Sequence, residues 1–409
     1  SPSTSSATAC ATRPTPIARA ALHRPKTALR IAFHTPLNLF ADGGVSGDRR
    51  MARQLVAALE SLGHVVEPVK IGRGYLRDSE AASLACLQAE AEALRENLLA
   101  SWRDGTAAAP DLWFTYHNYY RAPDLLGPEI ATALDIPYVT AEASDAARRA
   151  HDEWAPHTAI VRRGLDAADL HFHFTERDRL GLEPWRREGI ALLPLPPFIA
   201  FDRNPPRRIA DGGPPRLITI AMMREGTKQN SYLALARILD RIRDADWRLS
   251  IVGDGRKRGE IEQAFSGFPA GRVAFLGLLD RERALGELSH HDIFVWPGVR
   301  EAYGLVYLEA QATGLPVVAF DSGGVSATVQ RDETALLAPE GDEAAFAAAL
   351  AGLLRDGARR AAMGKAARRF VLSERTMARA AERLAEGLAI ACRNRSLKRQ
   401  ARAGGAPLP

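Results

Sequence analysis

Two carboxylates, Glu301 and Glu309, stand eight residues apart around the expected start of a helix. A short apolar strand precedes them, and the helix that opens at Gly304 carries an apolar stripe and ends at a Gly and Pro stop signal. The first turn of such a helix carries the positive end of the helix dipole, so it attracts an anionic group. Carboxylates beside it suit the hydroxyl groups of a sugar. The pattern predicts a pocket for a sugar nucleotide, with the backbone N–H groups of Gly304, Leu305 and Val306 facing the ligand.

The run from Glu301 to Glu309 resembles the Glu-x7-Glu signature of retaining glycosyltransferases of the GT-B fold, in the glycogen-synthase-like family 4, also called glycosyl transferases group 1. Bacteria use this family for surface glycans and glycolipids. The resemblance implies that Glu301 lies near the donor sugar and that Glu309 holds the ribose. Two glutamates on one helix are also common as solvated surface charges, but the surrounding strand, turn, helix and stop signals favour the functional interpretation.

A basic loop follows the expected strand at 216–220 and contains Arg224 and Lys228. It resembles the loop with which the same family grips the donor diphosphate, and a pair of solvated charges is the alternative. A departing nucleoside diphosphate gains negative charge, which a site without a metal must neutralise with cations and oriented dipoles. Asp244 and Asp246 have the spacing of a metal-binding Asp-x-Asp motif, but they end a helix before a strand. We interpret them as a turn and expect no metal and no cofactor.

Glycines mark two further loops that we expect beside the donor. Gly253 and Gly255 follow an apolar strand and resemble the Gly-Asp-Gly turn that the family places beside the nucleotide, with Leu276 near the base. A dinucleotide fingerprint is the weaker interpretation, because such a motif usually opens its domain. Gly43 and Gly44 lie in a loop of the first half that permits close backbone approach to phosphate or sugar. A plain flexible connection is the alternative for that loop.

Candidate acceptor-side residues follow two strands of the first half. His117 lies in the aromatic run 113–120, for which a packed aromatic cluster is the alternative interpretation. Many members of the resembled family have a His after the next strand, near the reacting sugar carbon, whereas this chain has Glu142. Glu142 is a candidate general base or nucleophile. The alternative is a structural acceptor for Arg148 and Arg149.

Strands alternate with helices through most of the chain, which predicts an α/β fold with parallel, helix-covered sheets. The alternation stops at a proline-rich joint and then restarts, so we expect two Rossmann-like doubly wound domains. The resemblance to GT-B enzymes implies that they face each other across a cleft and that a late helix returns to the first domain. The expected segments are a disordered tail (1–28), an acceptor domain (29–195), a linker (196–215), a nucleotide-sugar domain (216–373), a helix returning to the first domain (374–390) and a basic tail (391–409). A targeting segment is the alternative for the first tail.

Composition narrows the class of protein. The 409 residues are 46% hydrophobic and 25% charged, with a net charge of +5, as in a soluble globular protein with two cores. No apolar run is long enough to span a bilayer, and no nucleic-acid-binding motif accompanies the positive charge. The three cysteines show neither metal-ligand spacing nor a disulfide framework, which favours a reducing compartment. We expect a cytoplasmic protein and leave peripheral contact with the inner membrane face open.

Together these features predict a retaining glycosyltransferase. It would move a sugar from a nucleoside-diphosphate donor to a glycan, lipid-linked or small-molecule acceptor bound between the domains. The resemblance implies front-face attack assisted by the leaving phosphate, in surface glycan or glycolipid synthesis. Two alternatives stay open, a catalytically inactive sugar-nucleotide-binding protein and a nucleotide-sugar epimerase on the same fold. An NAD-dependent enzyme is the weakest interpretation.

Overall fold

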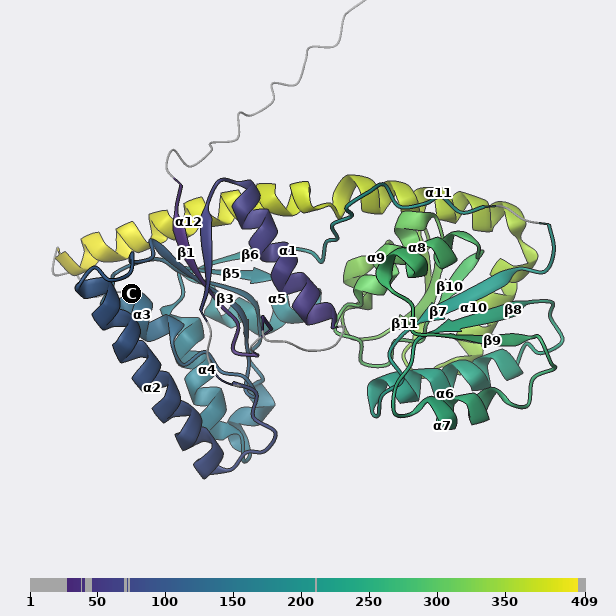
Figure 1. Ribbon diagram of the computed structural model, residues 1–409, viewed down its shortest axis with the longest axis horizontal. Helices are drawn as coiled ribbons and strands as arrows, with labels where there is room; N and C mark the ends of the chain where they lie inside the picture. The colour runs from purple at the N-terminus through teal and green to yellow at the C-terminus, as the bar shows by residue number, and fades with distance from the viewer. Residues whose placement is uncertain are drawn as a thin grey trace, which may run out of the picture.

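The computed structural model describes residues 28–37, 39–40, 46–69, 72, 74–209 and 212–403. Two parallel six-stranded sheets, each covered by helices, form two lobes that lie side by side (Figure 1). The strand order is β2-β1-β3-β4-β5-β6 in the first sheet and β12-β11-β10-β7-β8-β9 in the second. The predicted α/β class with two doubly wound domains is therefore confirmed. The tail expected at 1–28 lies outside the described residues except for its last position.

The first lobe is built around a fully buried central strand. Its strands are β1 (Arg30–His34), β2 (Val65–Val69), β3 (Leu112–Asn118), β4 (Tyr138–Ala143), β5 (Leu170–His173) and β6 (Ala191–Pro194). Its helices are α1 (Gly47–Ser61), α2 (Ala81–Arg103), α3 (Gly127–Ala133), α4 (Ala155–Ala167) and α5 (Glu176–Leu182), with short 3-10 turns at Ala147–His151 and Glu183–Trp185. Every residue of β3 is buried because helices cover both faces of the sheet, and Phe114 stacks on Phe33 with ring centroids 5.3 Å apart.

The second lobe repeats this architecture. Its strands are β7 (Arg216–Ile220), β8 (Arg248–Val252), β9 (Val273–Gly277), β10 (Ile293–Val295), β11 (Val317–Asp321) and β12 (Ala335–Pro339). Its helices are α6 (Thr227–Asp240), α7 (Arg258–Phe265), α8 (Arg281–Ser289), α9 (Leu305–Thr313) and α10 (Glu343–Arg355), with a 3-10 turn at Val325–Thr328. The apolar strands β10 and β11 form the centre of its core.

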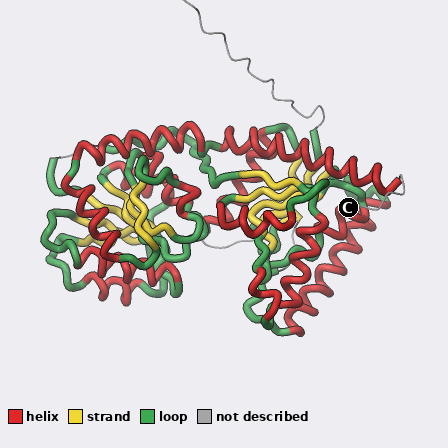
Figure 2. The backbone as a smooth tube through the Cα atoms, turned by 180° about the vertical axis from the view of Figure 1, so that it is seen from behind, coloured by secondary structure: helices red, strands yellow, loops and turns green. Residues whose placement is uncertain are grey.

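Two long helices, α11 (Gly357–Glu374) and α12 (Met377–Ala403), end the described chain, and α12 crosses from the second lobe to the first (Figures 1 and 2). Residues 391–403, which we expected to belong to a basic tail, continue α12. Lys398 pairs with the buried Asp169 at 2.9 Å, and Arg395 pairs with Asp135 at 3.1 Å. Carboxylates at the amino ends of β4 and β5 thus hold this basic segment in place. None of the helices within the described ranges has the length and apolar character that crossing a bilayer requires.

One apolar core joins the two lobes. Tyr303, Leu305 and Leu308 of the second lobe are buried in the same cluster as Phe174 and Phe198 of the first lobe. In Figure 1, α9 accordingly lies on the side of its lobe that faces α1. The start of α9 is therefore fixed at the junction, where residues that follow the strands of both sheets come together.

Candidate active site

Lys228 and Glu301 form an ion pair at the carboxyl edge of the second sheet. Lys228 lies in the first turn of α6, after β7, and Glu301 follows β10. The indole Nε1 of Trp296 donates to the Glu301 carboxylate at 3.3 Å, and the Lys228 ammonium lies 5.7 Å from the centroid of the same indole. The side chains of Lys228 and Glu301 are 18% and 14% exposed, so a ligand can reach them. The fold brings together two predicted site residues that are far apart in the sequence.

The helix start predicted as the anion site lies beside Glu301. Gly304 has a φ of 76°, and a Cβ at this position would lie 2.7 Å from the ring of Tyr307, so glycine is required there. The helix α9 begins at the next residue, Leu305, which is 6% exposed and packs in the core shared by the lobes. The backbone of Leu305 and Val306 thus forms the positive end of the helix dipole at the junction.

Gly253 and Gly255 fasten the loop after β8 to the loop after β7. The amide of Met223 donates to the carbonyl of Asp254 at 2.9 Å, and both glycines have positive φ, 142° and 152°. A Cβ on either glycine would overlap a carbonyl oxygen of the neighbouring loop. The contact fixes the loop that carries Arg224, whose own side chain is exposed. The predicted base neighbour, Leu276, is 36% exposed on β9 and so offers an apolar surface beside these loops.

Two arginines hold the carboxylate of Glu309. Arg50, in the first turn of α1, forms an ion pair with Glu309 across the junction, and the Nε of Arg281 lies 3.5 Å from the same carboxylate. Arg281 also donates to the carbonyl of Ala200 in the joint between the lobes. Burial and then the charge of Arg50 lower the pKa of Arg281. The carboxylate that we predicted to hold a ribose is therefore already bound to two cations.

Neither Arg50 nor Arg281 was among the predicted site residues. Arg50 stands just after the glycine-rich loop, and Arg281 stands four residues after Gly277 at the end of β9. Both arginines follow loops that we predicted to contact the donor, and this position could have marked them as site residues. Nothing in the sequence connects either of them to Glu309. Gly43 and Gly44, which we predicted to approach the donor, lie outside the described residues. Asp244 and Asp246 are exposed between α6 and β8, as expected of a turn.

His117 and Glu142 lie at the ends of the adjacent strands β3 and β4 with strained backbones. Their φ angles are 67° and 55°, a region that residues other than glycine rarely adopt and that is concentrated at functional sites. The Nδ1 of His117 lies 3.9 Å from Oε2 of Glu142. Within the described part of the chain, neither the His117 Nε2 nor the Glu142 Oε2 has a hydrogen-bond partner, although both atoms are buried. Arg149, which we considered as a partner of Glu142, pairs with Asp152 at 2.7 Å.

The protein environment favours the neutral forms of both groups. Burial raises the pKa of Glu142 well above its usual range, and Asp178 and Asp48 raise it further. Burial lowers the pKa of His117, against a smaller opposing effect of Asp48. Burial thus disfavours the charged forms of both side chains, which lie 3.9 Å apart. Perturbed, incompletely bonded acids and bases of this kind are typical of catalytic sites.

Two tyrosines connect this pair to the second lobe. The hydroxyl oxygens of Tyr116 and Tyr303 are 3.1 Å apart, and both side chains are buried. Tyr116 precedes His117 and packs on its ring with centroids 4.0 Å apart. Neither tyrosine was among the predicted site residues. Tyr303 lies inside the Glu-x7-Glu run, and Tyr116 lies inside the aromatic run.

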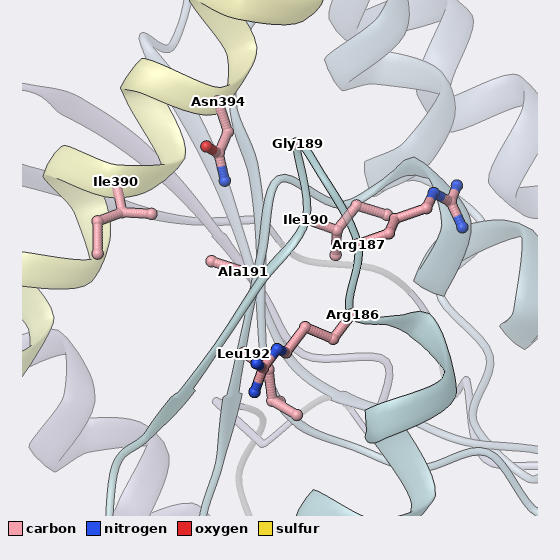
Figure 3. A pocket seen from close by; sticks show the side chains of 8 residues that line it. All are labelled: Arg186, Arg187, Gly189, Ile190, Ala191, Leu192, Ile390 and Asn394. Atoms are coloured by element: carbon pink, nitrogen blue, oxygen red, sulfur yellow. The ribbon is translucent and has the colours of Figure 1, made fainter. Parts of the chain in front are cut away.

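A pocket at the far end of the first sheet is separate from this site (Figure 3). It lies between the edge strand β6 and α12, and its lining residues are Arg186, Arg187, Gly189, Ile190, Ala191, Leu192, Ile390 and Asn394. Arg187 is paired with Asp166, and Asn394 donates to the carbonyl of Asp169 at 2.9 Å. The Asn394 bond fastens α12 to the sheet, and none of the predicted site residues lines this pocket.

Comparison with known proteins gives the same family as the motifs. Residues 214–356 match the family described as glycosyl transferases group 1. The sulfoquinovosyl transferase SQD2 of Arabidopsis thaliana is 34% identical over 39% of this chain and 31% of that protein. A GDP-mannose-dependent alpha-(1-6)-phosphatidylinositol monomannoside mannosyltransferase of Mycolicibacterium smegmatis is 31% identical over 56% of this chain and 64% of that protein. The chain thus spans less than two thirds of the length of these relatives.

Solved structures resemble both lobes together. The sucrose-phosphate synthase of Thermosynechococcus elongatus has a TM-score of 0.64 at 20% identity, covering 92% of this chain and 100% of that one. Anabaena HepE in complex with UDP has a TM-score of 0.61 at 16% identity, covering 88% of this chain and 100% of that one. Identities this low establish the fold and no more. The second lobe thus matches the group 1 glycosyl transferases over residues 214–356, and the two lobes together have the GT-B fold.

Proposed function

We propose that the protein transfers a sugar from a nucleoside-diphosphate sugar to a hydroxyl group of an acceptor, with retention of the anomeric configuration. One observation carries the proposal. The Lys228–Glu301 ion pair and the start of α9 lie on one side of the junction, and the His117–Glu142 pair lies on the other, with Tyr303 joining the two sides. Cations for a leaving diphosphate and an acid–base pair for an attacking hydroxyl are the two requirements of sugar transfer.

On the donor side, Lys228, Arg224 and the first turn of α9 neutralise the diphosphate. Donor binding separates the Lys228–Glu301 pair, because the phosphates attract the ammonium while sugar hydroxyl groups donate to the carboxylate. In this exchange, charge-assisted hydrogen bonds with the ligand replace the contact between the two side chains. Protein cations and the helix dipole then take the place of a metal ion in neutralising the leaving group. Glu309 receives the ribose hydroxyl groups once Arg50 has moved away.

On the acceptor side, Glu142 and His117 receive the attacking hydroxyl group. We propose front-face attack, in which the leaving diphosphate stays on the face of the sugar that the acceptor approaches, so that the configuration is retained. Contact between the lobes excludes water and suppresses hydrolysis of the donor. A glycan, a lipid-linked sugar or a small polyol fits this chemistry, and the resemblance to the family favours a role in surface glycan or glycolipid synthesis.

A ligand screen followed by a turnover assay tests the proposal. Melting temperature is measured with UDP, GDP and ADP and with their glucose and mannose derivatives, because a ligand that binds the native state raises it. The donor that stabilises the protein is then incubated with it, with and without EDTA, and release of the nucleoside diphosphate is followed. We expect binding and EDTA-resistant release. Binding without release would favour an inactive sugar-nucleotide-binding protein, and conversion of the donor to its epimer without release would favour an epimerase.

A further inference from the structure

One arginine on the acceptor side has no acidic partner among the described residues. Arg121 is partly exposed and lies in the loop that follows β3, close in sequence to His117. Its Nη1 donates to the hydroxyl of Tyr75 at 2.9 Å, and no carboxylate of the described chain lies within ion-pair distance of its guanidinium. Arginine stays charged at physiological pH and carries five N–H donors. Charge and donors therefore remain for a ligand.

Three aromatic rings lie around this guanidinium. Its central carbon, Cζ, is 5.0 Å from the ring centroid of Trp154, 5.8 Å from that of Tyr120 and 5.9 Å from that of Tyr75. The π faces of such rings attract a cation and displace part of its water, but they do not cancel its charge. Attraction between opposite charges is stronger where less water surrounds them. The aromatic rings thus favour binding of an anionic group to Arg121.

The backbone holds Arg121 in a fixed place. Two hydrogen bonds between the backbones of Tyr119 and Ala122, 2.8 and 3.3 Å long, close a tight turn around it. The amide of Leu76 donates to the carbonyl of Arg121 at 2.8 Å, which joins the loop after β2 to the loop after β3. A group that is already held in place loses less conformational freedom when a ligand binds, so this arrangement raises affinity.

The site around Arg121 lies at the same edge of the sheet as the acceptor-side pair. Arg121 and its ring partners follow β2, β3 and β4, and ligands of doubly wound sheets bind beyond the carboxyl ends of such strands. The ring centroids of His117 and Tyr119 are 6.4 Å apart, and those of Tyr119 and Tyr120 are 5.8 Å apart. A row of rings therefore leads from His117 to the ring beside the Arg121 guanidinium.

We propose that Arg121 binds a phosphate group of the acceptor through two parallel N–H donors, while a hydroxyl group of the same molecule reaches Glu142 and His117. This inference rests on the proposed transfer reaction and names the class of acceptor, a phosphorylated sugar or polyol. The planar guanidinium matches two oxygens of a phosphate, and charge-assisted pairs of this kind are the strong ones. A soluble phosphate ester and a lipid headgroup both present this group.

Arg149 provides a comparison within the same structure. Its Cζ lies 5.3 Å from the ring centroid of Tyr120, a ring that it shares with Arg121. Arg149 is paired with Asp152 at 2.7 Å and with Glu153 at 3.9 Å. The charge of Arg149 is thus compensated by neighbouring carboxylates. Replacement of Arg149 should affect phosphate binding much less than replacement of Arg121.

Phosphorus NMR titration in the absence of any donor tests the binding step. Glucose 6-phosphate and glycerol 3-phosphate are titrated with wild type, Arg121→Gln and Arg149→Gln, and Kd is taken from the change in the 31P signal. We expect Kd to rise roughly 10–100-fold in Arg121→Gln, because charge-assisted hydrogen bonds are lost. In Arg149→Gln it should change by about twofold or less. An equal loss of affinity in both variants would overturn the proposal.

A second variant decides the outcome if Arg121→Gln does not fold. Arg121→Lys keeps the positive charge but lacks the planar fork that binds two oxygens at once. We expect its Kd for glucose 6-phosphate to rise roughly 3–10-fold. A wild-type Kd in this variant would contradict binding through two parallel donors.

Vesicle sedimentation distinguishes the two sources of the phosphate. The probes are phosphatidylcholine vesicles with and without phosphatidylglycerol, whose headgroup carries both a phosphate and free hydroxyl groups. If the soluble esters do not bind, retention on the phosphatidylglycerol vesicles that is lost in Arg121→Gln and kept in Arg149→Gln would assign the site to a lipid headgroup. If Arg121→Gln behaves as wild type in both assays, the proposal fails.

A kinetic assay connects the site to sugar transfer. Release of UDP from UDP-glucose and of GDP from GDP-mannose is measured with glucose or glucose 6-phosphate as acceptor. We expect wild type to prefer the phosphorylated acceptor by roughly 10–100-fold in kcat/KM, and Arg121→Gln to lose this preference without a change in KM for the donor. A preference that persists in Arg121→Gln would refute the assignment. If wild type turns over neither donor, the proposed function fails while the phosphorus titration still decides the role of Arg121.

Discussion

The two sides of the junction hold their charged groups in opposite ways. On the side of the second lobe, Lys228 and Glu301 are ion-paired, and Glu309 is paired with arginines. On the side of the first lobe, His117 and Glu142 have strained backbones, and a buried side-chain atom of each has no hydrogen-bond partner among the described residues. Charged groups that already have counterions can exchange them for a charged ligand, whereas incompletely bonded groups with shifted pKa values suit proton transfer. We infer that the second lobe binds the donor and the first lobe carries the acid–base chemistry.

The strongest test of the binding side is Lys228→Ala. We expect kcat/KM for donor turnover to fall by roughly 10²–10³-fold, the usual effect of removing one group that stabilises developing negative charge. The melting temperature should also fall, because the Glu301 side chain is only 14% exposed and loses its cation. Lys365→Ala, an exposed lysine of α11, is the matched control. Wild-type rates in Lys228→Ala would remove it from the donor site.

The chemical side is tested by Glu142→Gln. We expect kcat to fall by roughly 10²-fold, because an amide cannot accept the acceptor proton. Affinity for UDP or GDP, measured by calorimetry, should stay unchanged because the nucleotide site belongs to the other lobe. Glu129→Gln, on the surface of the first lobe, serves as the control. A loss of nucleotide affinity as large as the loss of kcat would contradict the inference that the second lobe binds the donor and the first lobe carries the acid–base chemistry.

Acid should lower the free energy of unfolding of the first lobe, because the buried His171 must become protonated. His171 of β5 is bonded to Thr140 and to the carbonyl of Leu165, and burial lowers its pKa from 6.5 to about 4. Since the folded pKa is the lower one, the stability is fully present above pH 6.5 and is lost as the pH falls toward 4, by about 3 kcal/mol. Denaturant unfolding at pH 7 and pH 4.5 measures the loss. His171→Asn should show a smaller pH dependence, and equal dependence in both proteins would refute this origin.

The smallest effect is expected at the ion pair that covers Glu309. Arg50→Gln frees this carboxylate from one of its two cations, so a ribose no longer has to displace it. We expect UDP or GDP to bind about fivefold more tightly, a change of about 1 kcal/mol in binding free energy. Arg203→Gln, in which an arginine that is 90% exposed is changed, is the control for calorimetry. Weaker binding in Arg50→Gln would mean that Arg50 itself contacts the nucleotide.

Features that depend on neighbouring residues could be predicted from the sequence, whereas features that depend on contacts between distant residues could not. The strand, turn and helix around Glu301 and the loop that carries Lys228 lie within short segments, so residue types and spacing were sufficient to find them. The continuation of α12 to Ala403 could not be predicted, because its basic residues are held by Asp135 and Asp169, which are distant in the sequence. Charge clusters at chain ends resemble solvated tails until their partners are known.

The sequence by itself determined the two repeated sheets, the proline-rich joint and the run from Glu301 to Glu309, because hydrophobic period and turn residues act over a few neighbouring positions. Only the tertiary structure decided that Arg50 pairs with Glu309 and that Tyr303 meets Tyr116. These contacts exist because an apolar core joins the lobes and brings the ends of separate strands within hydrogen-bonding distance. The protonation of Glu142 is a property of that assembled environment, since burial and neighbouring charges set its pKa.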